Sequence, residues 1–252
     1  MISIMVRSFV YKKPPHECGL GNLFIQLTSM PPECRCLHDN VYDYELSNCV
    51  VIKGFTRVSY EGEQPTCPII INQHQLLNSH SKIKDIIEPT PHMKNLITQH
   101  LHLLEGVSAG MSIRRGSYCE DSRQYKDARA DANYHYFCSD SGLNNFREAI
   151  RREKGRVFLS SDSPSTVRQL LEEFGSKLSV IDMPYTVAST QDQHKNPTIE
   201  NLQKIYLKWF LLSMCPIVYI TGGIQDAKCE GFSTYAYIAA VYGGKNMEVI
   251  TN

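Results

Sequence analysis

The sequence has no excess of charge of either sign and no long apolar run. Lysine plus arginine and aspartate plus glutamate each number 26 among 252 residues, so the formal net charge is zero. This balance gives no electrostatic case for binding nucleic acid or an anionic membrane surface. No run approaches the roughly 20 apolar residues of a membrane span. The N-terminal MISIMVRSFVYKK is too short in apolar core for a signal peptide and lacks a cleavage site. We therefore predict a cytoplasmic protein without a transmembrane segment.

Paired cysteine motifs are also missing. The nine cysteines are an odd number, they are scattered, and no C-x₂-C pair occurs among them. Reduced thiols are therefore expected, rather than a disulfide framework. Cys34, Cys36 and His38 carry atoms that bind zinc, which leaves a structural zinc site as an alternative to ordinary thiols. We predict no metal site.

The pattern of the sequence changes near residue 105. Before that point, segments interrupted by proline predict strands at 2–9, 49–52, 56–60 and 68–71, and helices at 20–29 and 92–104. After it, strands at 111–114, 157–160, 178–181, 217–220 and near Val249 alternate with helices at 143–154, 165–174, 199–214 and 233–241. Such alternation is typical of a parallel sheet covered by helices, the α/β class. We predict one domain over 1–105 and a second over 106–252.

The most informative stretch is a buried strand that ends in two adjacent arginines, Arg114 and Arg115, followed by Gly116. Neighbouring side chains of a strand point to opposite faces, so one arginine can reach into a crevice while the other braces it. Ligands of open α/β sheets bind outside the carboxyl ends of the strands. The planar arginine fork suits phosphate oxygens there. The alternative is a pair of surface arginines that opens a loop.

Further polar or glycine-rich spots follow other predicted strands, and all would meet at the same edge of the sheet. Asp162 ends one strand, Gly222 and Gly223 end another, and Ser233 and Thr234 open the last helix. The free N–H groups of a helix start suit a phosphate. A carboxylate at position 162 suits the edge of a purine base. The alternative for Asp162, and also for Ser165, is the N-cap of the following helix, and Ser233 and Thr234 have the same alternative at the last helix.

The order of these motifs resembles a known family of enzymes. Gly19-Leu20-Gly21-Asn22 resembles the G-G-L-G-N opening of α-1,2-fucosyltransferases, and Ile113 to Tyr118 resembles their H-I-R-R-G-D-Y strand. The segment 157–164 is similar to F-F-V-F-S-D-D-P, and Phe232 to Ala240 is similar to S-T-F-S-W-W-A-A. The wider group includes α-1,6- and protein O-fucosyltransferases.

The resemblance implies a GT-B fold, in which two Rossmann-like domains face each other across a cleft. Because the chain ends soon after the last motif, a trimmed C-terminus is expected. The N-terminal domain would serve the acceptor and the C-terminal domain the nucleotide-sugar donor. The implied reaction is metal-independent, inverting transfer of a deoxyhexose, fucose by default, from a GDP-sugar to a glycan or protein hydroxyl. The absence of a D-x-D metal motif agrees with this.

The resemblance also assigns roles to individual residues. Arg114 would face the β-phosphate, with Arg115 as the second or supporting contact. Asp162 would read the guanine. Glu17, which precedes the Gly-Leu-Gly-Asn loop, is the candidate catalytic base, with a solvated loop charge as the alternative. The other donor-binding residues that the resemblance implies are Gly19, Gly21, Asn22, Phe232, Ser233 and Thr234.

The chain departs from the family pattern at several of these positions. Ser112 and Ser117 stand where the family has histidine and aspartate, Leu23 stands for glutamine, and Thr234 and Tyr235 stand for tryptophans. These departures leave other donors open, such as rhamnose or another deoxyhexose on GDP or UDP. They also leave open a catalytically dead protein that binds nucleotide or carbohydrate. A Rossmann-type oxidoreductase or methyltransferase is a further alternative, but the Gly-Leu-Gly lacks the third glycine of the dinucleotide fingerprint.

Overall fold

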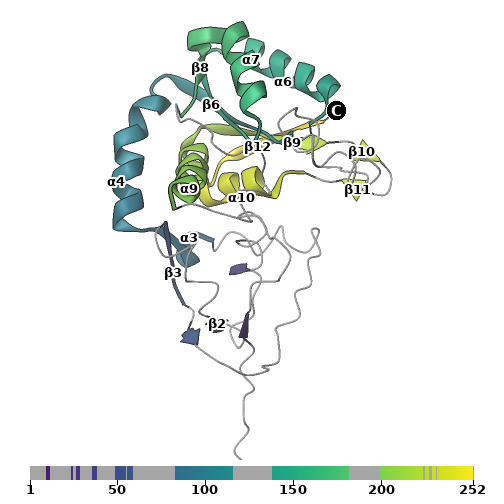
Figure 1. Cartoon of the computed structure of the whole chain (residues 1–252). Coiled ribbons are helices and arrows are strands. Elements are labelled where there is room, and N and C mark those ends of the chain that lie inside the picture. The colour runs from purple at the N-terminus through teal and green to yellow at the C-terminus, as the bar shows by residue number, and fades with distance from the viewer. Residues whose placement is uncertain are drawn as a thin grey trace, which may run out of the picture.

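A five-stranded parallel sheet forms the centre of the structure, a computed structural model (Figure 1). The structure describes residues 10–11, 24, 27–28, 36–38, 49–54, 56–58, 83–115, 138–181, 199–223, 225–226, 229–230 and 232–251. The strand order is β12-β9-β6-β7-β8, and every neighbouring pair is parallel. The strands are β6 (Val107–Ile113), β7 (Arg156–Ser161), β8 (Leu178–Ser179), β9 (Ile217–Gly223) and β12 (Asn246–Thr251).

Read in chain order from β6, these strands are arranged 3-2-1-4-5, which is the order of a Rossmann-type sheet. The predicted α/β class with a parallel sheet is therefore confirmed. The second Rossmann-like domain of the GT-B arrangement, and the boundary between 105 and 106, stay predictions.

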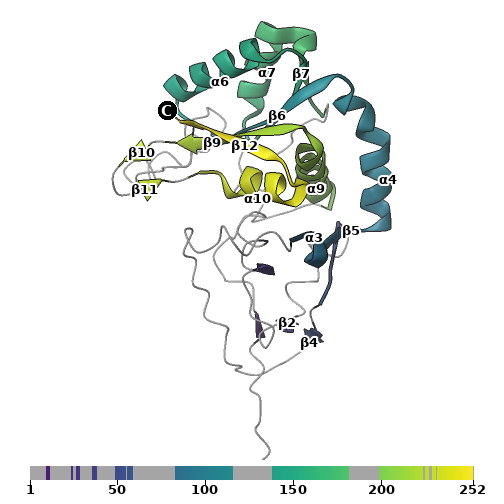
Figure 2. The ribbon, with the colours of Figure 1, turned by 180° about the vertical axis from the view of Figure 1, so that it is seen from behind.

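Helices cover both faces of this sheet (Figures 1 and 2). On one face lie α6 (Asp140–Arg152) and α7 (Pro164–Phe174), and on the other lie α9 (Ile199–Met214) and α10 (Thr234–Gly243). Met111 and Ile113 pack with Phe146 of α6, whereas Phe158 and Ile220 belong to the core that α9 and α10 cover. Alternate residues of each strand thus serve opposite faces, as the pleat requires.

Gly110 allows α9 to lie close against β6. A Cβ added at Gly110 would lie 2.7 Å from Cδ1 of Leu212 and 2.8 Å from Sγ of Cys215. Real side chains do not tolerate such distances, so any other residue here would displace the helix. Gly110 therefore faces α9, whereas Ala109, Met111 and Ile113 belong to the core on the side of α6.

The elements before β6 are short. A parallel sheet contains β1 (Val10–Tyr11), β2 (Cys36–His38) and β4 (Thr56–Val58), in the order β1-β2-β4. An antiparallel pair contains β3 (Val50–Ile52) and β5 (Ile87–Pro89), next to α3 (Ile83–Ile86). Then follow α4 (Pro91–His100) and a 3₁₀ turn (Leu101–Leu104). A second antiparallel pair, β10 (Gln225–Asp226) and β11 (Cys229–Glu230), follows β9.

One hydrophobic core links the early part of the chain to the later sheet. Phe24, Val50 and Ile83 are buried in the same cluster as Trp209 of α9. The ring of Phe24 meets the ring of Trp209 edge to face at 5.0 Å between centroids, a favourable geometry for aromatic pairs.

Most predicted elements after residue 82 are confirmed, with shifted ends. The helix at 199–214 has the predicted bounds. The strand predicted at 111–114 begins earlier, at Val107, and ends before Arg114. The helix predicted at 92–104 continues past His100 only as the 3₁₀ turn. The strands predicted at 2–9 and 68–71 lie outside the described residues. Within the described ranges, no helix is long and apolar enough to cross a membrane.

Candidate functional site

The carboxyl edge of the sheet contains the point at which the strand order reverses. β6 lies between β7 and β9. The chain leaves β6 and β7 toward helices on one face, and leaves β9 toward α10 on the other. In open α/β sheets this reversal opens a crevice at the carboxyl ends, and ligands bind there. Arg114 directly follows β6, and Gly222 and Gly223 are the last two residues of β9.

Thr221 of β9 joins the arginine strand to the start of α10. Its hydroxyl donates to the carbonyl of Ser112 at 2.9 Å and accepts from the N–H of Arg114 at 3.0 Å. Its carbonyl accepts from the N–H of Ser233 at 2.8 Å. Thr221 is fully buried. These three bonds fix Arg114 and Ser233 relative to each other, so the structure brings these two predicted residues to one place.

The two arginines have different surroundings. The Arg115 guanidinium is buried and donates to the carbonyl of Cys138 at 2.8 Å and to Oδ1 of Asp140 at 2.5 Å. The Arg114 carbonyl accepts from the N–H of Cys138 at 2.7 Å. Arg115 therefore holds the chain after β6 against the start of α6. Because side chains alternate along the strand, Arg114 belongs to the opposite face, the side of α9 and α10, where it is half-buried.

Asp162 follows β7, and its Oδ1 accepts from the N–H of Arg115 at 2.7 Å. Next to it, the Ser161 hydroxyl donates to the carbonyl of Ile113 at 2.8 Å, which ties the ends of β6 and β7 together. The carboxylate is thus directed toward the arginine strand. A main-chain N–H is a well-oriented donor, so the position of this carboxylate is fixed by the backbone.

The prediction that Asp162 or Ser165 caps α7 is wrong. Ser163 is the N-cap, and its hydroxyl accepts from the N–H of Thr166 at 3.2 Å. The reason is geometric: Pro164 sets the first turn of the helix, which places position 163, not 162, where a side chain reaches the free N–H groups. The Asp162 carboxylate therefore does not serve as the cap of α7.

The start of α10 presents its first N–H groups at this edge. Ser233 occupies the N-cap position and is buried, but its hydroxyl makes no capping hydrogen bond. Thr234 is the first residue of the helix. Phe232, just before, packs its ring on Tyr237 with centroids 5.0 Å apart. The free N–H groups of the first turn and the positive end of the helix dipole favour an anion here.

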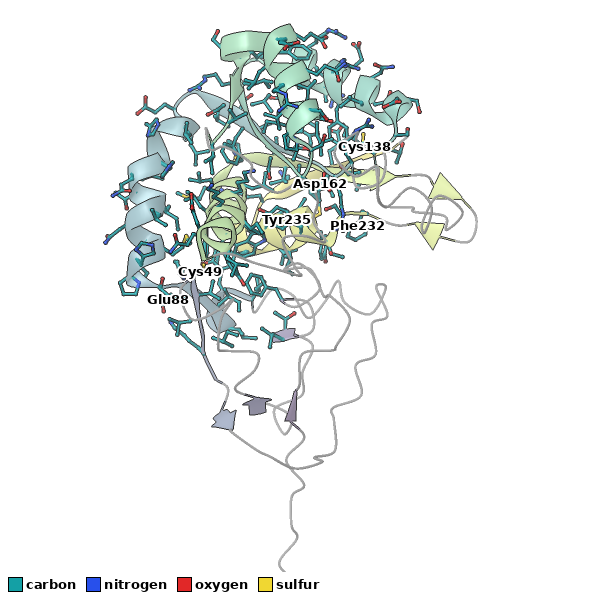
Figure 3. All side chains as sticks on the ribbon, viewed as in Figure 1. Cys49, Glu88, Cys138, Asp162, Phe232 and Tyr235 are labelled. Atoms are coloured by element: carbon teal, nitrogen blue, oxygen red, sulfur yellow. The ribbon has the colours of Figure 1, made fainter. Side chains whose placement is uncertain are left out.

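Several residues that shape this edge escaped the sequence analysis: Thr221, Cys138, Asp140 and Lys208. Tyr235 donates its hydroxyl to the carbonyl of Ile205 in α9 at 2.8 Å. Burial raises the pKa of the Cys138 thiol to about 11, against the opposing effect of Arg115. In Figure 3, Cys138, Asp162, Tyr235 and Phe232 lie in one region, away from Cys49 and Glu88. Only Thr221 had a sequence signal, because it precedes two glycines at a strand end.

The remaining predicted site residues, Glu17, Gly19, Gly21 and Asn22, lie outside the described residues. The zinc-capable Cys34 also lies outside them, whereas Cys36 and His38 form the ends of β2. Among the residues that the structure describes, no group of three or more histidine, cysteine, aspartate or glutamate side chains is placed to hold a metal ion.

Comparisons with known proteins find similar solved structures but no similar sequence. No family model and no curated protein sequence matches the chain. A NodZ α-1,6-fucosyltransferase co-crystallized with GDP is 11% identical, covers 93% of this chain and 92% of its own, and has a TM-score of 0.49. Fucosyltransferase NodZ from Bradyrhizobium is 16% identical over 73% of this chain and 53% of its own, with a TM-score of 0.38.

The apo-form of POFUT1 is also similar, at 8% identity over 79% of this chain, with a TM-score of 0.43. The match covers 55% of the POFUT1 chain. This chain therefore spans about half the length of POFUT1 and of the Bradyrhizobium NodZ structure.

Proposed function

We propose that this chain is a metal-independent, inverting glycosyltransferase of the fucosyltransferase type. It would transfer a deoxyhexose, fucose by default, from a nucleoside-diphosphate sugar to a hydroxyl of a glycan or protein. The observation that carries the proposal is the meeting of Arg114, Asp162 and the start of α10 at the reversal point of a 3-2-1-4-5 sheet. The same residues belong to the segments that resemble fucosyltransferase motifs.

The phosphate side of the site would be formed by Arg114 together with Ser233 and Thr234. As the bond to the sugar breaks, negative charge grows on the departing diphosphate. A guanidinium and the N–H groups of a helix start both stabilise such charge without a metal ion. The bonds of Thr221 to Arg114 and Ser233 hold the two parts in place before the substrate arrives.

The part of the site that binds the nucleobase would be formed by Asp162. One of its oxygens accepts from the Arg115 N–H, and a carboxylate has further lone pairs for the N–H groups of a purine edge. Guanine presents such donors, so GDP is the expected nucleotide.

The reaction also needs a catalytic base, because the acceptor hydroxyl must lose a proton. Glu17 of the predicted acceptor-side domain is the proposed catalytic base.

Binding of nucleotides to the wild-type chain tests this proposal first. Titration calorimetry with GDP, UDP and ADP should give the tightest binding for GDP. Hydrolysis of GDP-fucose, and then transfer to a glycan panel, should survive an excess of chelator, because Arg114 and the start of α10 replace the charge of a cation. Activity that chelator abolishes and manganese restores would contradict the proposed mechanism. A chain that binds none of the three nucleotides would refute the proposed function.

A second candidate is a protein that binds the nucleotide sugar without transferring it. The motivation is Ser112, which stands where the family pattern has histidine and is buried, with its carbonyl bonded to Thr221. Such a residue contributes no charge beside Arg114. Tight GDP binding without hydrolysis or transfer across GDP-fucose and GDP-rhamnose would favour this candidate.

A further inference from the structure

A lysine lies buried in the wall of the proposed site. Lys208 of α9 is only 7% exposed, on the helix that covers β6 and β7. Burial lowers the pKa of Lys208 to about 7, while the nearby carboxylate of Asp162 acts in the opposite direction. A buried ammonium is costly unless an opposite charge or hydrogen bonds compensate for it. The carboxylate that follows β7 is thus close enough to Lys208 to interact with it electrostatically.

The packing of α9 explains how Lys208 comes to face this edge. Leu212 of α9 lies against Gly110 of β6, because a Cβ added at Gly110 would be 2.7 Å from Cδ1 of Leu212. Residues 208 and 212 are four apart on a helix and so lie on one side, which places Lys208 on the side of α9 that faces the sheet. Phe158 of β7 packs in the core that α9 covers, and side chains of a strand alternate, so Asp162, four positions later, belongs to the same face.

We propose that Lys208 is a positioning residue for nucleotide selection, which acts through Asp162. Its ammonium would hold the carboxylate from the α9 side, while the Arg115 N–H holds it from the β6 side. This role rests on the proposed function, in which Asp162 contacts the base. A carboxylate fixed by two donors keeps its remaining lone pairs in one direction, which favours one arrangement of base N–H groups over another.

Lys204 offers a matched control. It lies one turn earlier on α9 and is buried to a similar degree, with 9% exposure. Its ammonium pairs with Glu200 at 3.1 Å. The same substitution at Lys204 thus removes a buried cation from the same helix without removing the partner of Asp162.

The experiment compares Lys208→Met, Lys208→Arg and Lys204→Met with the wild type. Each is titrated with GDP, UDP and inorganic pyrophosphate, and its thermal melt is recorded. Lys208→Met should weaken GDP binding by about tenfold, which is less than the full contribution of one charge-assisted hydrogen bond, because Lys208 acts only through Asp162. It should also reduce the preference for GDP over UDP and leave pyrophosphate binding unchanged. Lys208→Arg should retain most of the preference, and Lys204→Met should behave as the wild type.

Specific outcomes overturn the inference. A folded Lys208→Met protein with wild-type GDP affinity and preference would show that the lysine does not act on the base. Equal losses of GDP and pyrophosphate binding would place its effect on the whole site. If Lys204→Met lost as much of the preference for GDP over UDP as Lys208→Met, the effect would also belong to the whole site and not to Lys208 in particular. A wild-type chain that binds no nucleotide removes the proposed function and this role with it, so the wild-type titration separates the two failures.

Discussion

The two ends of the central sheet use different chemistry to satisfy their polar groups. At the amino end, long charged and phenolic side chains bond to one another. The Glu153 carboxylate accepts from the hydroxyls of Tyr219 and Ser108, each at 2.6 Å, and Arg152 pairs with Glu248 at 2.8 Å. At the carboxyl end, side chains bond mainly to the main chain. Thr221 and Ser161 bond to the backbone of β6, and Asp162 accepts from the N–H of Arg115.

This difference separates a supporting end from the end at which we propose binding. At the amino end, each carboxylate in these pairs is already matched to a side-chain donor of the protein. At the carboxyl end, short hydroxyls fix the backbone, and the backbone in turn places Arg114 and the start of α10. Groups held by the backbone lose little freedom when a ligand arrives, which is the condition for stabilising a charge that appears only during reaction.

Replacing Arg114 should produce the largest loss of activity among the changes considered. The loss should come from the carboxyl end of the sheet and not from the amino end. We expect Arg114→Ala to reduce kcat/KM on the order of 10²-fold or more, because it removes a preorganised charge beside the leaving diphosphate. Arg114→Lys should also be damaging, because lysine lacks the planar fork. The measurement is steady-state kinetics with the donor identified by nucleotide binding. Arg152→Ala is the control at the amino end and should keep wild-type turnover. A folded Arg114→Ala with near wild-type turnover would refute the assignment.

Two neighbouring residues after β7 separate binding from folding. Asp162→Ala should weaken nucleotide binding by roughly 1.5–3 kcal/mol, the cost of a hydrogen bond to a charged group. Ser163→Ala should instead lower stability by about 1 kcal/mol, the cost of an N-cap, with nucleotide affinity unchanged. Calorimetric titration beside thermal melts measures both. If Asp162→Ala lowered only the melting temperature, Asp162 would serve the fold and not the nucleotide.

The sequence predicted well those features that depend on local pattern. The helix at 199–214 has the predicted bounds, because a long run of helix formers with many apolar residues lies between Pro197 and Pro216. The position of Arg114 at a strand end also follows from local pattern, because apolar residues give way to charge there. The cap of α7 was missed by one residue, since Asp162, Ser163 and Ser165 are all good caps and only the backbone geometry selects among them.

The contacts of the site depend on register and could not be predicted. Cys138 lies 23 residues after Arg115, yet its carbonyl binds the guanidinium. Thr221 reaches Arg114 only because β9 pairs with β6, with Ser112 opposite Ile220. Lys208 looks in the sequence like the exposed charge of an amphipathic helix. It is buried because α9 is covered on several sides, by the sheet, by α10 and by α4.

The pH dependence of stability sharpens the comparison between the two ends of the sheet, because Lys208, a buried titratable group, lies toward the carboxyl end. The folded pKa of Lys208 is about 7, whereas an unfolded lysine titrates near 10.4. Between these values the unfolded state binds more protons, so the free energy of unfolding rises with pH. We expect the wild type to gain on the order of 1–2 kcal/mol relative to Lys208→Met between about pH 6 and about pH 8.5.

Urea unfolding of both proteins across this range measures the effect. The comparison with Lys208→Met is needed because the buried thiols act in the opposite direction. Burial raises the pKa values of Cys49 and Cys215 to about 12, so these thiols reduce stability once the pH passes the pKa of an unfolded cysteine. Both proteins share that contribution, and the difference between them isolates Lys208. Parallel stability curves for the two proteins would contradict a buried, perturbed lysine.

The smallest effect is expected at the amino end, from the pair of Arg152 and Glu248. Both side chains are well exposed, at 59% and 43%, and an exposed pair gains little because water and salt screen it. The Glu248 carboxylate and the Tyr219 hydroxyl raise the pKa of Arg152, but arginine is charged at every working pH, so this shift changes no protonation state. Glu248→Gln should therefore leave the melting temperature and the nucleotide affinity unchanged within error, at low and at high salt. A clear fall in nucleotide affinity would couple the amino end of the sheet to the site and remove the distinction between a supporting and a binding end.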